Sequence, residues 1–214
     1  MPGSIYLYSR CAIKTIKENV KPLLDVLSEE SKENLREIGI LQLFNMSTIQ
    51  QNIRMLYYII RLYSAKRNVF LLGKFYVKFT VNHVALILGL PNRGREFQFE
   101  RIPLSNRKHK ELAQELVDLT AEDSSPTLES RRINCLIRYV LAVFFFPLKR
   151  LKVSTCLLDF NGLEDFAAVN WPKAIHTFLH SHFASMNEIA IGEEMTNLGY
   201  LEGCSVIIVV SKNT

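Results

Sequence analysis

The sequence predicts a mainly α-helical fold, a single helical domain with a small β-hairpin inserted between helices. Three observations support this prediction. Apolar residues recur at helical spacing along most of the 214 residues, one stretch switches to the β-branched and aromatic composition of strands, and caps and breakers separate the segments. A hydrophobic content of 48% is sufficient for a packed core.

The first part of the chain is predicted to be helical. Residues 20–27 carry apolar side chains at helical spacing, and Ser31 starts a second short helix that Gly39 can end. Ser47 or Thr48 can cap a third helix, whose apolar stripe continues to the start of the strand-like stretch.

The strand-like stretch covers residues 68–80, NVFLLGKFYVKFT, and is rich in β-branched and aromatic residues. Gly73 and Lys74 at its centre suit the two-residue turn of a β-hairpin. Thr80 then acts as the N-cap of a short helix over residues 81–88, because its hydroxyl can accept from a free N–H of the first turn.

A glycine-punctuated segment, GLPNRG, follows that helix and invites comparison with a phosphate-binding loop. Such loops place their glycines after a strand and before a helix, whereas these glycines come after a helix. We therefore interpret Gly89 as a left-handed helix terminator with Leu90 packed back on the last turn. Pro91 prevents continuation and Gly94 completes a turn.

The second half is predicted to contain one exposed helix before the core helix. Residues 93–107 show no sustained period and are predicted to be a loop, and residues 108–120 form an exposed helix. A turn over residues 122–126 leads to the longest helix, residues 128–146, which Pro147 closes.

The last predicted helix spans residues 171–183, with Asn170 as its N-cap and Pro172 in its first turn. Trp171, the only tryptophan, is expected to anchor this helix in the core, with a role on a binding surface as the alternative. The apolar run after Tyr200 fits either a strand or a short buried helix.

Composition indicates an intracellular, non-secreted protein. The four cysteines are far apart and form no CxxC pair, which fits a reducing compartment, and no secretory leader is evident. The apolar run over residues 139–147 is far shorter than the roughly 20 residues that a spanning helix needs, so no membrane is expected as a partner. The net charge of +5 permits an acidic partner.

The histidines of HTFLHSH are the candidate metal ligands. His176 and His180 lie one helical turn apart and could share a zinc ion in a metal-assisted hydrolase. His182 projects from a different side of a regular helix, and no carboxylate or thiol is placed by the sequence to complete the ligand set. An amphipathic surface helix that carries histidines is the favoured interpretation, with no cofactor or small-molecule substrate.

Basic residues supply a candidate nucleic-acid contact. They form two clusters that lack the interleaved aromatic residues of a stacking platform. The first comprises Arg101, Arg107, Lys108 and Lys110, and the second comprises Lys149, Arg150 and Lys152.

Several blocks, taken in their order along the chain, resemble the plant mobile domain family, whose members are often labelled aminotransferase-like. The blocks are IGILQLFNMSTIQQNIRMLYYIIRLYS, NVFLLGKFYVKFT, FTVNHVALILGLPNRG, CLIRYVLAVFFFPLKR, VSTCLLDFNGLEDFAAVNWPKAIHTFL and YLEGCSVIIVV. This resemblance implies a helical lead-in over residues 1–37 and a family domain over residues 38–210. The chain ends where the family usually continues, so a C-terminally truncated or decayed copy is expected.

The resemblance also implies a role. It suggests a non-enzymatic, transposon-derived interaction module in the nucleus, with nuclear or chromatin-associated proteins as partners and a link to transposon silencing or genome stability. No catalytic residue carries over, because the shared motifs are of structural type. These are Gly89, Leu90, Pro91, Gly94, Pro147, Asn170 and Trp171.

Two alternative functions come from the residues themselves. Direct binding of DNA through the two basic clusters is the first alternative. Metal-assisted hydrolysis by the His176 and His180 pair is the second.

Overall fold

The computed structural model describes residues 6–9, 13–47, 52–122, 125–192, 197–205 and 207. These residues are mostly helical, with three small sheets, so the predicted mainly α fold class is confirmed. The single-domain organisation and the boundary between residues 37 and 38 stay predictions.

The N-terminal part is helical, as the apolar spacing led us to expect, but it contains four described helices where three were predicted, and their ends differ from the prediction. They are α1 (Ile13–Val26), α2 (Glu29–Glu37), α3 (Ile40–Asn45) and α4 (Ile53–Arg61). Ser31 is not the start of α2, because Ser28 is the N-cap and its Oγ accepts from the Ser31 N–H at 3.2 Å. Asn52 rather than Ser47 caps α4, accepting from the Met55 N–H at 3.1 Å, and Thr48 lies outside the described residues.

The predicted hairpin forms. Strands β2 (Tyr63–Ser64), β3 (Val69–Leu72) and β4 (Phe75–Val77) make an antiparallel sheet in the order β2-β3-β4. Thr80 caps α5 (Val81–Leu88) by accepting from the His83 N–H, and the His83 ring accepts from the Thr80 N–H in return. This local reciprocity explains why the start of α5 could be read from sequence.

The second half contains strands that the sequence did not predict. Its elements are β5 (Leu104–Lys108), α6 (His109–Ala121), α7 (Pro126–Tyr139), the π-helix η1 (Val140–Phe145), β6 (Lys152–Ser154), α8 (Thr155–Leu158), α9 (Gly162–Ala167) and α10 (Trp171–Gly192). The prediction of a loop over residues 93–107 was wrong at its end, because β5 is created by antiparallel pairing with β6 and not by any local alternation.

Helical winding changes near the end of the predicted long helix. The chain continues from α7 into η1, where the Phe146 N–H donates to the Leu141 carbonyl five residues earlier at 2.9 Å. Pro147 follows this turn and is itself buried, so the helical path ends where the sequence predicted.

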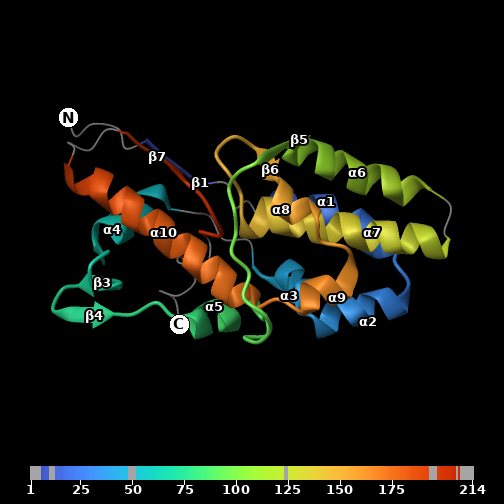
Figure 1. Cartoon of the computed structure of the whole chain (residues 1–214), viewed down its shortest axis with the longest axis horizontal. Helices are drawn as coiled ribbons and strands as arrows, with labels where there is room; N and C mark the ends of the chain where they lie inside the picture. Colours follow the sequence, from blue (N-terminus) through green and yellow to red (C-terminus); the bar gives the residue numbers. More distant parts are fainter. Residues whose placement is uncertain are drawn as a thin grey trace.

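Two groups of elements meet along the middle of the molecule (Figure 1). In one group α1 and α7 pack against α6, and in the other α10 packs against α4, α5 and β2. Strands β1 (Tyr6–Ser9) and β7 (Asn197–Leu201) form a parallel pair beside α10. The buried apolar residues of both groups form one continuous core.

Trp171, at the start of α10, lies in the middle of this core with 2% of its surface exposed. Aromatic rings from several distant segments surround its indole, with ring centroids between 4.9 and 6.3 Å away. These are Phe97, Phe145, Phe146, Phe160 and Phe166. The indole Nε1–H donates to the Phe166 carbonyl at 2.8 Å, so its one polar group is satisfied. Asn170 caps the helix by accepting from the Lys173 N–H at 3.0 Å.

The glycine-punctuated segment lies directly against the Asn170-Trp171 segment. Gly89 has the left-handed φ of 67° that ends α5, and the Leu90 N–H donates to the Ala85 carbonyl at 3.1 Å. Gly94 has a φ of 116°, and a Cβ added to it would lie 2.7 Å from the Ala168 carbonyl oxygen. The next residue, Arg95, forms an isolated parallel bridge with Val169, in which the Arg95 N–H donates to the Ala168 carbonyl at 2.7 Å. Only a glycine fits this approach of two backbones.

Replacing Gly94 by alanine is expected to destabilise the fold strongly. A methyl group would meet backbone atoms and impose an unfavourable φ, so we expect a loss of about 3 kcal/mol in the free energy of unfolding. Gly73 is the matched control: its φ is also positive, at 62°, but an added Cβ would meet nothing within 4 Å, so Gly73→Ala should cost about 1 kcal/mol. Urea unfolding monitored by circular dichroism measures both, and equal losses would contradict the close-approach argument.

Candidate functional site

The hairpin of β3 and β4 is anchored at its base and unsupported at its tip. Phe70 in β3 is buried, with its ring centroid 5.2 Å from that of Tyr63 and 5.6 Å from that of Phe183 in α10. Leu72 and Phe75 flank the turn, and directly paired side chains lie on the same face of an antiparallel ladder. The face that begins in the core at Phe70 therefore continues through Leu72 and Phe75, which no described element covers. The hairpin of β3 and β4 projects from the body of the molecule below α4 and α10 (Figure 1).

Large apolar side chains on both faces of the hairpin tip are exposed. Phe75 is 76% exposed and Tyr76 is 62% exposed, which is unusual for rings of this size at neighbouring positions. The other exposed apolar residues of this hairpin are Leu71, Leu72 and Val77. A contiguous apolar surface of this kind is typical of a site that contacts another macromolecule.

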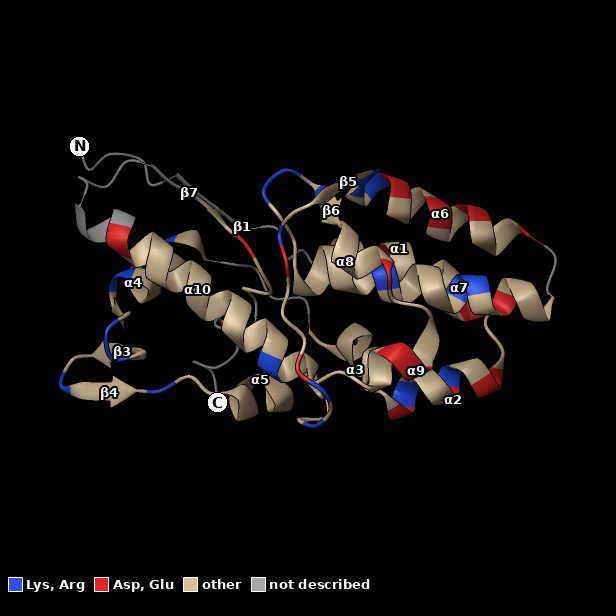
Figure 2. Cartoon of the chain, in the orientation of Figure 1, with Lys and Arg blue, Asp and Glu red and all other residues tan. Residues whose placement is uncertain are grey.

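This hairpin belongs to a stretch of chain without acidic residues. Between Glu37 and Glu96 the sequence holds eight Lys and Arg residues and no Asp or Glu. Figure 2 shows basic residues on α4 and in the segments next to β3 and β4, and no acidic residue on α4, β3, β4 or α5. On α10, the neighbouring helix, Glu188 near the C-terminal end is the only acidic residue. The hairpin is therefore an apolar surface in a basic setting.

The two basic clusters predicted from sequence form one group in the structure. Antiparallel pairing of β5 with β6 makes Lys108 and Lys152 register partners, and the His109 N–H donates to the Leu151 carbonyl at 2.9 Å. Arg150 lies exposed in the turn before β6, and Lys110 lies exposed at the start of α6. Sequence reasoning treated these clusters as separate because Lys108 and Lys152 lie 44 positions apart in the chain.

Part of the two basic clusters already forms ion pairs or a cation–π contact within the same chain. Arg107 forms an ion pair with Glu115 of α6, and the Lys149 ammonium lies 5.5 Å from the centroid of the Tyr200 ring. Arg101 forms an ion pair with Glu202 at 3.3 Å. Lys108, Lys110, Arg150 and Lys152 are in no ion pair among the described residues.

The helix that carries the histidines is not the surface helix that the sequence suggested. His180 and His182 are only 8% and 7% exposed, because α10 is covered by β2, β7 and the other helices. The ring centroids of His176 and His180 are 4.1 Å apart, so the predicted neighbourhood is present. Within the part of the chain that the structure describes, however, no group of three metal-ligating side chains forms around them.

Burial favours the neutral forms of both histidines. Tyr63 donates its only hydroxyl hydrogen to Asn68 Oδ1 at 2.6 Å. In the contact of 2.9 Å with His180, the Tyr63 oxygen is therefore the acceptor and the His180 Nδ1–H is the donor. His180 Nε2 then has no partner among the described residues. Burial lowers the pKa of His180 to about 4, with a further contribution from His176, and burial likewise lowers the pKa of His176.

Cys135 has the character of a structural cysteine. Burial raises the pKa of Cys135 to about 12, so its thiol stays protonated at neutral pH, as in an inert structural cysteine. Cys156 is partly buried and donates to the Glu100 carbonyl at 3.4 Å, and Cys11 lies outside the described residues.

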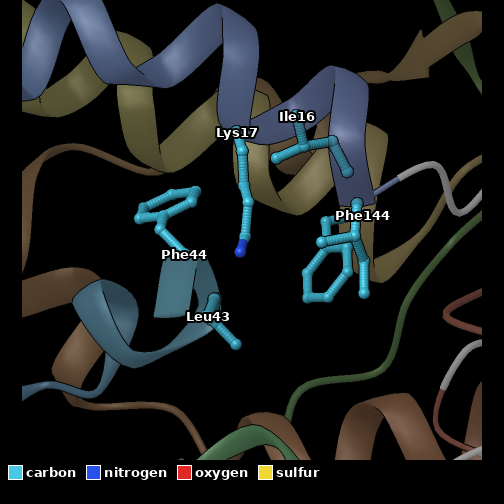
Figure 3. A pocket seen from close by; sticks show the side chains of 6 residues that line it. Ile16, Lys17, Leu43, Phe44 and Phe144 are labelled. Atoms are coloured by element: carbon cyan, nitrogen blue, oxygen red, sulfur yellow. The ribbon is translucent and has the colours of Figure 1, made fainter. Parts of the chain in front are cut away.

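A small hollow between α1, α3 and η1 is lined by apolar side chains and by Lys17 (Figure 3). It has room for about one water molecule. Lys17 extends across it and donates to the Met46 carbonyl, so its ammonium already has a partner. A hollow of this size does not accommodate a cofactor or substrate.

Comparison with known proteins identifies a family but not a function. A family model described as a domain of unknown function (DUF8566) matches residues 9–209. The chain belongs to this family. No curated protein and no solved structure matches the chain.

The resemblance to the plant mobile domain family is wrong, because the family found over residues 9–209 of this DUF8566 chain is a different one. The shared blocks were helix stops, aromatic helices and a hairpin, which unrelated helical proteins can also contain. The aminotransferase-like label and the transposon-derived, nuclear and chromatin-associated role rested on that resemblance and lose this support. Among the described residues, no helix combines the length and apolar character that crossing a membrane requires.

Sequence reasoning found the hairpin but missed its importance. The run of eight basic and no acidic residues was visible in the sequence and marks this region of the DUF8566 chain. The exposure of Phe75 and Tyr76 had no local signal, because the same alternating pattern occurs in strands that are buried.

Acid is expected to destabilise this protein between pH 6.5 and 4.5. The pKa values of His176 and His180 are lower in the folded state than in the unfolded chain, so the unfolded chain binds more protons. The contribution of the two neutral histidines to stability is therefore fully present above about pH 6.5 and is lost as the pH drops towards 4. We expect a loss of about 1–3 kcal/mol, measured by urea unfolding at several pH values.

A variant with His176→Gln and His180→Gln should show a much smaller slope in this window. His83→Gln, which changes an exposed ring and removes only a lesser contribution to the lowered pKa of His176, should keep most of the wild-type slope. Burial raises the pKa values of Glu129 and Glu202, but hydrogen bonds lower them further. Protonation of these two carboxylates therefore reduces the stability of the fold only below their ordinary pKa of 4.5. An unchanged slope in the double variant would show that the two histidines are not responsible.

Proposed function

We propose that this chain is a non-enzymatic protein-interaction module that binds its partner through the tip of the β3–β4 hairpin. The observation that carries the proposal is the exposure of five large apolar side chains on a short hairpin that no described element covers. Burying such a surface is favourable by about 25 cal/mol per Å², and aromatic residues are enriched where proteins meet.

Photocrosslinking tests this proposal. The photoreactive residue p-benzoylphenylalanine at position 75, in cells that express the chain, should give a discrete crosslinked protein that mass spectrometry identifies. The same residue at Val117, an exposed apolar position on α6, is the matched control and should not. A Leu72→Ser, Val77→Ser variant should lower the crosslinking yield at least about ten-fold, because the apolar contact is lost.

The variant should keep its stability within about 0.5 kcal/mol, since both side chains are at the surface. Leu86→Ser on α5, where the side chain is 80% exposed, controls for the loss of an exposed leucine. Crosslinking that is equal at positions 75 and 117, or unaffected by the hairpin variant, would contradict the proposal.

Direct nucleic-acid binding is a second candidate function. It is favoured by the pairing of β5 with β6, which gathers Lys108 and Lys152 beside Arg150. Cations held at fixed spacing can contact successive phosphates and release counterions. The partial neutralisation of Arg107 by Glu115 weakens this candidate relative to the hairpin.

If this second candidate is right, a duplex DNA of 20 base pairs should bind with an affinity that falls steeply with salt. Changing Lys108, Arg150 and Lys152 to alanine should reduce the slope of log affinity against log salt by about 2–3. Lys14→Ala and Lys21→Ala on α1 provide the control for a general loss of charge. A mobility shift that is absent, or insensitive to salt, would exclude this function.

A further inference from the structure

Among the residues that the structure describes, β4 is an edge strand. β4 has β3 as its single described neighbour, and the sheet order is β2-β3-β4. Leu71 pairs with Tyr76, and the Leu71 N–H donates to the Leu62 carbonyl at 2.7 Å, away from β4. Tyr76 is therefore in a non-hydrogen-bonded pair, so its own N–H and C=O point to the outer edge. These groups can accept another strand.

Side chains on the two faces of β4 differ in character. Phe75 and Val77 lie on the face that continues from Phe70, and both are exposed and apolar. Successive side chains alternate, so Tyr76 and Lys78 lie on the opposite face. Arg67 donates to the Tyr76 hydroxyl at 2.6 Å, which adds a second cation to that face. A strand added at this edge would meet an apolar face and a basic face.

The lysines at each end of β4 select against one obvious partner, a second copy of the chain. If two β4 edges paired antiparallel about Tyr76, Lys74 of each copy would lie opposite Lys78 of the other. Like charges in directly opposed positions are destabilising. No described carboxylate is in an ion pair with Lys66, Lys74 or Lys78, so these charges are available to a partner.

A lipid surface and a nucleic acid fit these features less well. Hydrocarbon cannot satisfy the outward N–H and C=O of Tyr76, which would cost several kcal/mol. Bases stack on aromatic rings, whereas Leu71, Leu72 and Val77 are aliphatic. A protein strand satisfies the backbone groups and the aliphatic side chains together.

We propose that the free edge of β4 pairs with an extended segment of another protein in which apolar side chains alternate with Asp or Glu. This inference rests on the proposed function and names the chemistry of its partner. The apolar side chains of the segment would extend the Phe75 and Val77 face, and its carboxylates would face Lys78 and Arg67. Backbone pairing would supply affinity and the alternation would supply specificity.

Binding of defined peptides to the whole chain tests this proposal. The probe is a fluorescein-labelled peptide, Glu-Val-Glu-Phe-Glu-Val-Glu, measured by fluorescence anisotropy. Its charge-reversed counterpart replaces each Glu by Lys, and a third peptide carries N-methyl groups on alternate residues. We expect saturable binding of the acidic peptide, and binding at least about ten-fold weaker for each of the other two.

The matched protein variants reverse or spare the charge of the hairpin. Lys74→Glu with Lys78→Glu should weaken the acidic peptide at least about ten-fold and favour the lysine peptide. Lys14→Glu with Lys21→Glu on α1 changes the net charge equally and should leave the preference unchanged. Circular dichroism confirms that each variant is folded.

Three results would overturn the proposal. The first is that the acidic peptide does not bind. The second is that the N-methylated peptide binds as tightly as the acidic peptide. The third is that phosphatidylserine vesicles or oligothymidine bind more tightly than the acidic peptide, and that the Lys74→Glu, Lys78→Glu variant loses this binding. The outcome is separable from that of the proposed function. If the protein crosslinked at position 75 is still captured by the charge-reversed variant but no acidic peptide binds, the interaction module stands and the acidic strand does not.

Discussion

The burial of Trp171 is the constraint on which the arrangement of this protein depends. A buried indole requires both a large apolar pocket and an acceptor for its N–H, and the Phe166 carbonyl supplies the acceptor. The pocket is built from rings at positions 97, 145, 146, 160 and 166. The segment after α5, the π-helical turn, α9 and the start of α10 must therefore converge on one side chain. The backbone contact at Gly94 holds the same junction from outside.

Anchoring α10 at Trp171 determines where the hairpin lies. The same helix presents Phe183 to Phe70, so the base of β3 is attached to a rigid element. Beyond Phe70 no described helix covers the sheet, and Phe75 stays exposed. A well-packed scaffold that ends in an unsupported strand edge is a suitable way to hold a binding surface in a fixed geometry.

Charge distinguishes the two surfaces that could bind another molecule. In the β5–β6 group, Arg107 is already paired with Glu115, and α6 brings further carboxylates close to the lysines. Around the hairpin, by contrast, the chain from residue 38 to residue 95 has no acidic residue to compete with a partner. An acidic ligand would therefore recover more electrostatic free energy at the hairpin than at β5 and β6.

Local interactions made much of this fold predictable. The turn at Gly73, the Thr80 cap and the helix stop at Gly89 depend on residues within about five positions of one another, so the amino-acid sequence alone determined them. The same holds for the long apolar helices. Trp171 was expected to anchor its helix in the core and does so, but the distant segments that surround it had no local signal.

Tertiary structure decided what the molecule presents to others. Lys108 meets Lys152, and His180 is buried against Tyr63, through pairings between residues more than 40 positions apart. No local period encodes such pairings. The exposure of Phe75 likewise depends on what packs against the hairpin, because an apolar side chain is a core residue or a binding residue only according to its neighbours.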